Sequence, residues 1–226
     1  MLAPAGASAG PVRPPAAAGS VAAVRGLFVT FEGIDRSGKT TQARLLLDAL
    51  GDAAVGVREP GGTAAGERVR ALLKDPEVEL SPAGEALLFA AARAELVGQV
   101  IRPALEAGKV VVSDRFLDSS LAYQGDARGL GVAEVERVNA FATGGLTPDL
   151  TLLLDLDPGA AGRRGAVEDD RFEQEGRALQ ERVAAAYERL AEAAPARWRR
   201  IAADRPPEEV HAEVLATVEA ARRERA

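Results

Sequence analysis

The feature that most constrains the fold of this chain is the segment at residues 33–40, which reads GIDRSGKT. A glycine, four further residues and then Gly-Lys-Thr is the spacing of a phosphate-binding loop (P-loop). Its glycines let the backbone curl with N–H groups pointing inward, where they and the next helix N-terminus can bind phosphate oxygens. An apolar run precedes the segment and a helical pattern follows it. We therefore predict a nucleotide-binding loop between a first strand and a first helix, with a structural glycine turn as the alternative.

The side chains of this loop suggest individual roles. Lys39 is expected to reach the β- and γ-phosphates of a nucleotide, and Thr40 to place its hydroxyl on Mg²⁺. Asp35 and Arg36 stand side by side, at positions where many such loops carry small residues. This pair raises the question of which substrate each charge faces.

Composition excludes several classes of protein. The chain has 226 residues, which suits one α/β domain. It has no cysteine, so disulfides, zinc–thiolate sites and a cysteine nucleophile are excluded, in agreement with a reducing cytoplasm. The net charge of −6 argues against general coating of DNA or RNA, so we expect no nucleic-acid partner. No apolar run approaches the roughly 18 residues that a membrane-spanning helix needs.

The order of local patterns predicts the fold. Residues 1–25 are almost all Ala, Gly, Pro, Val and Ser without apolar periodicity, and are expected to form a disordered N-terminal extension to a single domain at 26–226. A short apolar, β-branched run predicts a buried strand at 26–33, and further strands are predicted at 53–62, which runs into a Pro-Gly-Gly loop, at 109–115 and at 149–157. The segment 196–204 could be the last strand. Between and after them, helical patterns occur at 39–50, 65–75, 81–108, 134–145, from Pro158 onward, up to about Ala194, and at 206–226.

Strands separated by helices imply a parallel sheet covered on both faces. We therefore predict a P-loop NTPase fold of the α/β class, a three-layer sandwich in which helices flank a five-stranded parallel sheet. In the long pattern at 81–108, Ser81 is the expected cap, Pro82 the first helical residue, and Pro103 a bend or a new start.

The loop alone fits a GTPase, a motor or a small-molecule kinase. No guanine-reading Asn-Lys-x-Asp run occurs, and a motor would be larger. Transfer of a phosphoryl group to a small acceptor requires several positive groups around the phosphates. Arg36 and Arg115 stand at the carboxyl ends of predicted strands, the edge where open parallel sheets bind ligands. Further arginines that could converge there are Arg58, Arg70, Arg93, Arg163, Arg164 and Arg171.

From about Arg25 to its C-terminus the chain resembles bacterial thymidylate kinases. The resemblance rests on six segments in order: FEGIDRSGKTTQ (31–42), REPGGT (58–63), LLFAAARAE (87–95), SDRFLDSSLAYQG (113–125), PDLTLLLDLDP (148–158) and DDRFEQEG (169–176). It implies a nucleoside monophosphate kinase-like fold and the reaction ATP + dTMP → ADP + dTDP, with Mg²⁺. On this resemblance the ATP-binding residues are Gly33, Ile34, Asp35, Arg36, Ser37, Gly38, Lys39 and Thr40.

The resemblance also assigns the acceptor side. Phe89 matches the position that stacks on thymine, and Arg93, one helical turn later, the arginine that donates to the base carbonyl. Tyr123 matches a tyrosine under the deoxyribose, which disfavours a 2′-hydroxyl. Arg70 and Arg115 match arginines on the acceptor phosphate, where a guanidinium pairs well. The remaining implied dTMP-binding residues are Glu59, Pro60, Ser119, Ser120 and Gln124.

The same resemblance gives the loop charges separate partners. Asp35 would hold the acceptor near its 3′-hydroxyl, and Arg36 would face the donor phosphates. Asp114 would join Thr40 in the magnesium shell, partly through water. Adenine is expected near the loop at residues 203–204.

Thymidylate kinases use one of two arrangements of the catalytic arginine. In one it lies in the P-loop; in the other that position is glycine and the arginine comes from a lid. This chain has Arg36 in the loop and also two arginines in a lid-like patch at about 162–173. The predicted catalytic residues are therefore Lys39, Arg36, Arg115, Asp35, Arg163 and Arg164, with Asp170, Arg171, Phe172 and Glu173 at the far end of the lid. Arg36 is expected to be essential and a lid arginine contributory.

Two other functions stay open at this point. One is another nucleotide or nucleoside kinase of the same fold, and the other is a nucleotide-dependent switch without transferase activity. His211, the only histidine, lies far from every motif and is expected at the surface. Members of the family commonly form homodimers through long helices, and the apolar face of residues 84–101 could serve here.

Overall fold

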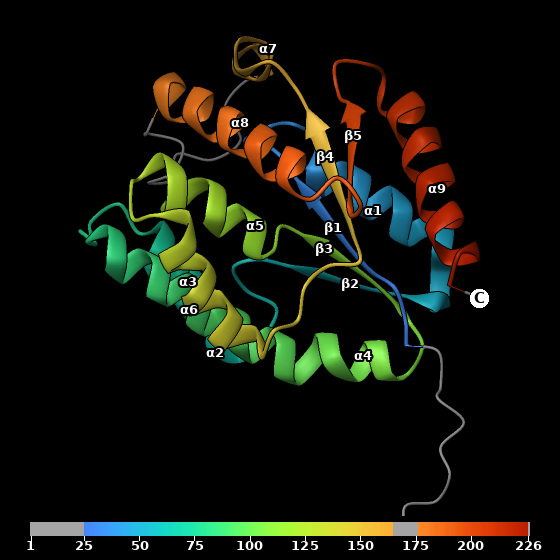
Figure 1. The fold of residues 1–226 in the computed structure, drawn as a ribbon, viewed down its shortest axis with the longest axis horizontal. Helices are drawn as coiled ribbons and strands as arrows, with labels where there is room; N and C mark the ends of the chain where they lie inside the picture. Colours follow the sequence, from blue (N-terminus) through green and yellow to red (C-terminus); the bar gives the residue numbers. More distant parts are fainter. Residues whose placement is uncertain (1–24, 165–175, 226) are drawn as a thin grey trace, which may run out of the picture.

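The computed structural model describes residues 25–164 and 176–225, and the structural statements below concern these residues. A five-stranded parallel sheet forms the centre of the molecule, in the order β2-β3-β1-β4-β5. Figure 1 shows it covered by helices on both faces, so the predicted three-layer sandwich is confirmed. The strands are β1 (Phe28–Glu32), β2 (Ala54–Arg58), β3 (Val110–Asp114), β4 (Leu150–Asp155) and β5 (Trp198–Ala202).

The helices follow the predicted alternation with strands. In chain order they are α1 (Lys39–Leu50), α2 (Ala64–Lys74), α3 (Pro82–Leu96), α4 (Arg102–Glu106), α5 (Leu117–Ser120), α6 (Val132–Thr143), α7 (Pro158–Arg163), α8 (Gly176–Ala193) and α9 (Pro207–Arg223). A short 3₁₀ turn, Gly51–Ala53, follows α1, and π-helical turns occupy Val97–Ile101 and Leu121–Ala127.

Alternate residues of the strands are buried on opposite faces of the sheet, as the continuous apolar runs predict. Val29 and Phe31 of β1 belong to the same core cluster as Leu46 of α1. Phe28, which precedes Val29 and so points to the opposite face of the sheet, belongs to a second cluster with Leu105 of α4. The sheet therefore has a dry contact with helices on each side.

The long pattern at 81–108 folds as two helices joined by a π-helical turn. Ser81 caps α3 by accepting a hydrogen bond from the Gly84 N–H at 3.1 Å, and Pro82 is its first residue. Pro103 lies in the first turn of α4, where its missing N–H costs no hydrogen bond. The predicted restart at Pro103 is confirmed.

One helical region lies where no element was predicted. Residues 117–127 form α5 and the π-helical turn that follows it. This segment contains serine, glycine and aspartate and lacks a regular apolar period. It is helical because Leu117, Leu121 and Ala122 are buried against the core, which is a tertiary effect.

The register of the sheet brings three strand ends together. Phe31 of β1 lies opposite Asp114 of β3, and Arg58 of β2 lies opposite the same aspartate. The P-loop after β1, the Glu59–Pro60 segment after β2 and Arg115 after β3 therefore meet at one edge. No helix in the described parts of the chain is both long and apolar enough to cross a membrane.

Candidate active site

The P-loop has the backbone that its glycines allow. Gly33 has a φ of 140°, and a Cβ there would lie 2.7 Å from the carbonyl oxygen of Leu154. Gly38, with a φ of 100°, immediately precedes α1. Arg36 adopts a φ of 63°, in the left-handed region that a side chain enters at a cost. The loop thus presents the start of α1 to the carboxyl edge of the sheet.

Lys39 lies inside this loop. Its Nζ donates to the carbonyl oxygens of Gly33 at 3.1 Å and Ile34 at 2.6 Å, and to the Ser37 hydroxyl at 3.4 Å. Burial, followed by the positive charge of Arg115, lowers the pKa of Lys39 to about 8. An ammonium held so far from bulk water is well placed to favour an incoming anion.

Thr40 and Asp114, the two residues predicted to hold magnesium, are in contact. The Thr40 hydroxyl donates to Asp114 Oδ2 at 2.5 Å. No group of three or more His, Asp or Glu side chains able to hold a metal occurs in the described residues. One hydroxyl and one carboxylate are oxygen donors of the kind that Mg²⁺ takes alongside several waters and substrate phosphates. These two oxygen donors therefore fit Mg²⁺ better than a metal ion whose ligands all come from the protein.

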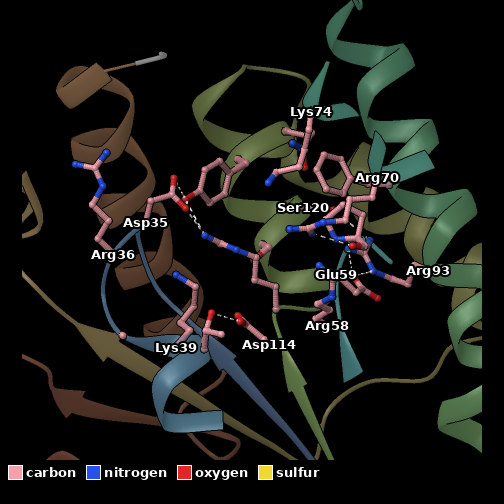
Figure 2. Close-up of a pocket in the computed structure, with 18 of the residues that line it drawn as sticks. Asp35, Arg36, Lys39, Arg58, Glu59, Arg70, Lys74, Arg93, Asp114 and Ser120 are labelled. Carbon is pink, nitrogen blue, oxygen red and sulfur yellow. Dashed lines mark hydrogen bonds and ion pairs between the residues drawn. The ribbon is translucent and has the colours of Figure 1, made fainter. Parts of the chain in front are cut away.

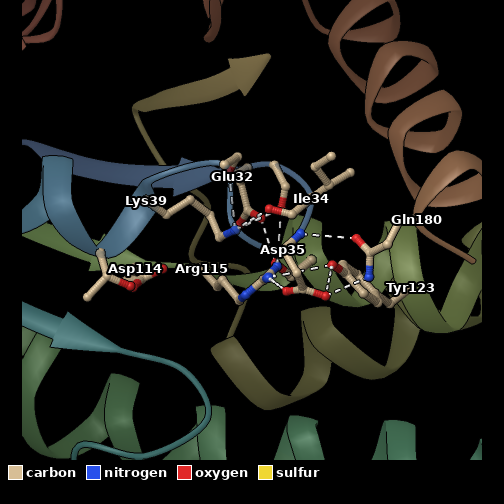
Figure 3. A network of polar contacts seen from close by, with 12 residues as sticks. Glu32, Ile34, Asp35, Lys39, Asp114, Arg115, Tyr123 and Gln180 are labelled. Carbon is tan, nitrogen blue, oxygen red and sulfur yellow. Dashed lines mark hydrogen bonds and ion pairs between the residues drawn. The ribbon is translucent and has the colours of Figure 1, made fainter. Parts of the chain in front are cut away.

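Asp35 and Arg115 form an ion pair across the mouth of the loop (Figure 3). Arg115 Nη2 lies 2.5 Å from Asp35 Oδ1, and Arg115 Nη1 donates to the Ser119 hydroxyl at 3.1 Å. The other carboxylate oxygen of Asp35 accepts from the Tyr123 hydroxyl at 3.2 Å and from Gln180 Nε2 at 2.7 Å. Burial favours the neutral acid, but Arg115, Lys39 and these hydrogen bonds outweigh it and lower the pKa of Asp35.

Arg93 is completely engaged by protein groups. It is 1 % exposed, and its Nε donates to Glu59 Oε2 at 2.7 Å. It also donates to the Ser120 hydroxyl at 3.1 Å, to the Phe116 carbonyl oxygen at 3.2 Å and to Asn139. Burial raises the pKa of Glu59 although Arg93 opposes the shift. Arg93 of α3 thus joins α5, α6 and the segment after β2, and it also lines the cavity described next.

One cavity of about 680 Å³ connects the P-loop to Phe89 (Figure 2). The predicted residues that line it are Asp35, Arg36, Gly38, Lys39, Thr40, Glu59, Pro60, Arg70, Phe89, Arg93, Asp114, Arg115, Ser119, Ser120, Tyr123, Gln124 and Arg164. Gly33, Ile34 and Ser37 lie beneath it and offer oxygens to Lys39. Thr41 and Lys74 also line it and were not predicted as site residues. Arg58, one of the arginines that could converge at this edge, lines it too.

Comparison with known proteins agrees with this geometry. A family model described as thymidylate kinase matches residues 31–214. The chain belongs to the thymidylate kinase family. A thymidylate kinase of Deinococcus radiodurans is 49% identical over 201 residues, covering 86% of this chain and 97% of the relative. One from Pelotomaculum thermopropionicum is 50% identical over 203 residues, covering 87% and 94%.

A solved structure supports the fold. The crystal structure of a thymidylate kinase from Ehrlichia chaffeensis has a TM-score of 0.71 and 34% identity, covering 86% of this chain and 99% of that one. The nucleoside monophosphate kinase-like fold expected of a thymidylate kinase is therefore confirmed. Most of the predicted lid lies outside the described residues, including Asp170, Arg171, Phe172 and Glu173.

The two lid-side arginines that the structure describes differ in position. Arg164 lines the cavity and donates to the carbonyl oxygens of Arg36 at 3.0 Å and Ala203 at 2.6 Å. It therefore spans the P-loop and the loop after β5. Arg163, the last residue of α7, is exposed and does not line the cavity. Sequence alone gave these neighbours equal roles.

Three residues of the polar network around Asp35 and Arg115 were not predicted from the sequence: Glu32, Gln180 and Tyr187. Glu32, at the end of β1, is fully buried and accepts from the Phe116 N–H at 2.8 Å, the Ser119 hydroxyl at 2.6 Å and the Tyr187 hydroxyl at 2.8 Å. Gln180 and Tyr187 lie on α8. Glu32 stands within the FEG segment and could have been noticed there as an acid in a strand. No local pattern in α8 marks Gln180 or Tyr187.

Glu32 should make stability fall as pH rises. Burial, followed by the negative charge of Asp118, raises the pKa of Glu32 from 4.5 to about 7. Between these values the folded chain binds a proton that the unfolded chain has released, so the free energy of unfolding decreases with increasing pH. Relative to Glu32→Gln, which does not titrate, the wild type should lose about 3 kcal/mol between pH 4.5 and 7.

Urea denaturation of both proteins across this range measures the difference. Glu192→Gln, a change of an exposed glutamate on α8, is the control and should run parallel to the wild type. If the free energies of unfolding of Glu32→Gln and the wild type changed with pH in parallel, the raised pKa of Glu32 would be contradicted.

Proposed function

We propose that this chain transfers the γ-phosphate of ATP to dTMP, forming dTDP and ADP. The observation that carries the proposal is the continuous cavity, whose lining includes Lys39 of the P-loop, Phe89 and Arg115. Figure 2 shows the P-loop residues Asp35 and Lys39 on one side of it and Arg93 and Ser120 on the other. Such a cavity can hold two nucleotides with their phosphates facing each other. In-line transfer needs that arrangement.

At the P-loop end, the donor phosphates would lie on the loop N–H groups and the start of α1. Lys39 would exchange its loop carbonyls for the β- and γ-phosphate oxygens. Thr40 and Asp114 would hold Mg²⁺, partly through water, and this ion would neutralise charge on the phosphates when bound. Asp35 is turned toward the cavity, whereas Arg36 extends from another side of the loop (Figure 2).

At the Phe89 end, the thymine ring would stack on Phe89. Arg93 and Ser120, held together by their hydrogen bond, would lie at the base edge with Gln124 nearby, and Arg93 would exchange one of its protein acceptors for the base carbonyl. Ser119, Glu59 and Pro60 would complete the walls. Tyr123 would lie under the deoxyribose.

The acceptor phosphate would be held by arginines. Arg115 directly follows β3, and Arg70 of α2 is oriented by donating to the Pro60 carbonyl oxygen at 3.0 Å. The attacking oxygen belongs to a phosphate that is already anionic, so no side chain has to remove a proton from it. Arg36 and Arg164 would stabilise charge on the transferring group, and the position of Arg163 on the outer side of α7 favours Arg164 over it.

We also propose that the chain acts in the cytoplasm as a homodimer. Three large apolar side chains are exposed on helices that pack together: Phe141 of α6 at 92 %, Leu87 of α3 at 57 % and Leu72 of α2 at 38 %. A second copy of the chain could cover these side chains, which would explain why they are exposed in a single copy. The cytoplasmic location is proposed because the chain has no cysteine.

A coupled assay for ADP tests the function directly, with dTMP, dUMP, dCMP, dAMP and thymidine as acceptors. dTMP should be preferred by kcat/KM, because thymidine lacks the phosphate, dAMP and dCMP present a different base edge to Arg93 and Ser120, and dUMP lacks the 5-methyl group. Preference for dCMP, dAMP or thymidine would favour another kinase of this fold. Nucleotide binding without ADP formation on any acceptor would favour a switch.

A further inference from the structure

We propose that Gln180 of α8 is a positioning residue that fixes Asp35 for its contact with the sugar of the acceptor. The proposal rests on the dTMP kinase function proposed above. The Asp35 N–H donates to Gln180 Oε1 at 3.0 Å, and Gln180 Nε2 donates to Asp35 Oδ2 at 2.7 Å. One side chain therefore holds both the backbone and the carboxylate of Asp35 (Figure 3).

The chemistry of this contact selects a glutamine. The Asp35 N–H can only donate, and its ionised carboxylate can only accept. A primary amide supplies one acceptor and two donors, so Gln180 satisfies both groups and its orientation is fixed by them. A glutamate would keep only the acceptor, an arginine or lysine only the donor, and an alanine neither.

Asp35 needs such a partner because its carboxylate is pulled from one side. Oδ1 is held by Arg115 at 2.5 Å, the strongest charge in contact with it. Gln180 and Tyr123 hold Oδ2 from the opposite side. The two sets of contacts together leave the carboxylate one orientation. The 3′-hydroxyl of dTMP would then donate to a carboxylate oxygen that is already fixed, so binding does not have to order the Asp35 side chain.

The helix that carries Gln180 is itself anchored to the site. Tyr187, seven residues and about two turns further along α8, donates to Glu32 Oε2 at 2.8 Å and lies 2.9 Å from the Ser119 hydroxyl. Tyr187 is 1 % exposed, whereas Gln180 is only partly buried. Tyr187 therefore fixes α8 against β1, and Gln180 transmits that position to the P-loop.

The test compares two acceptors, dTMP and its 3′-deoxy analogue, in steady-state assays of the full chain. Gln180→Ala should lower kcat/KM for dTMP by about 10-fold, the usual effect of losing a charge-assisted hydrogen bond. The loss with 3′-deoxy-dTMP should be no more than about 2-fold, because the hydroxyl that Asp35 would meet is missing. The KM for ATP should not change. Glu181→Ala, at the next and exposed position of α8, should behave as wild type.

A double-mutant cycle separates positioning from a structural role. In the Asp35→Asn background, Gln180→Ala should cost less than about 2-fold further, because the carboxylate that Gln180 orients is already removed. Gln180→Glu, which places a carboxylate against Asp35, should lose at least as much activity with dTMP as Gln180→Ala. A thermal melt of each variant identifies any that fails to fold.

Equal losses on the two acceptors, or additive losses in the cycle, would overturn the role of Gln180 while leaving the kinase function in place. Wild-type activity in a Gln180→Ala variant would do the same. A wild type that forms no dTDP would instead overturn the proposed function.

Discussion

Lys39→Ala should lower kcat for phosphate transfer to dTMP by about 100- to 1,000-fold, as loss of one buried donor to a developing charge does elsewhere. Lys39 is buried, held by three oxygens of the P-loop, and has a pKa lowered to about 8. The fold should survive, because the ammonium is costly to bury and the released carbonyls lie at the edge of the cavity.

The matched control for this variant is Lys109→Ala. Lys109 contacts the carbonyl oxygen of Asp52, outside the cavity, and is one of only three lysines in the chain. It should retain wild-type kcat. Steady-state kinetics and a thermal melt on both variants give the comparison. Activity of Lys39→Ala within about 5-fold of wild type would contradict its role.

Arg115→Ala should lower kcat/KM for dTMP by about 1,000-fold while the KM for ATP changes little. Arg115 faces Asp35 and Ser119 and stands beside Tyr123, with its guanidinium 5.2 Å from that ring. A planar guanidinium can hold two phosphate oxygens at once, so Arg115→Lys should also lose activity, though less. Alanine and lysine both carry a Cβ, as arginine does, so neither substitution changes the backbone strain at this position, where φ is 71°.

The comparison of the two substrates identifies what Arg115 binds. Arg137→Ala removes an exposed arginine paired with Glu134 on α6 and should have no effect on either substrate. A loss confined to the KM for ATP would place Arg115 on the donor side and contradict the assignment.

The parts of the fold set by local sequence were predictable. The strands at the centre of the sheet, β1, β3 and β4, are largely apolar runs, and the P-loop is a short motif whose spacing fixes its backbone. Ser81 and Pro82 mark the start of α3 because capping depends on neighbouring residues. The helix at 117–127 was missed because burial, not periodicity, holds it.

The contacts made across the fold were not predictable. Arg93 was predicted to face a base, but its pairing with Glu59 and Asn139 depends on where α3 and α6 pack. Gln180 lies 145 residues from Asp35, and nothing near it in the chain indicates the contact. Arg163 and Arg164 are neighbours in sequence. Arg163 is the last residue of α7, whereas Arg164 follows the helix and reaches the loop after β5.

In the proposed reaction, the part of the cavity lined by Phe89 and Arg93 holds a pyrimidine monophosphate whose phosphate points to the P-loop. A crystal structure of the full chain with dTMP tests it most directly. We expect the thymine ring to stack on Phe89, the phosphate to lie on Arg115 and the 3′-hydroxyl to lie beside Asp35. A ring bound away from Phe89 and Arg93, or a nucleotide in the reverse direction, would contradict it.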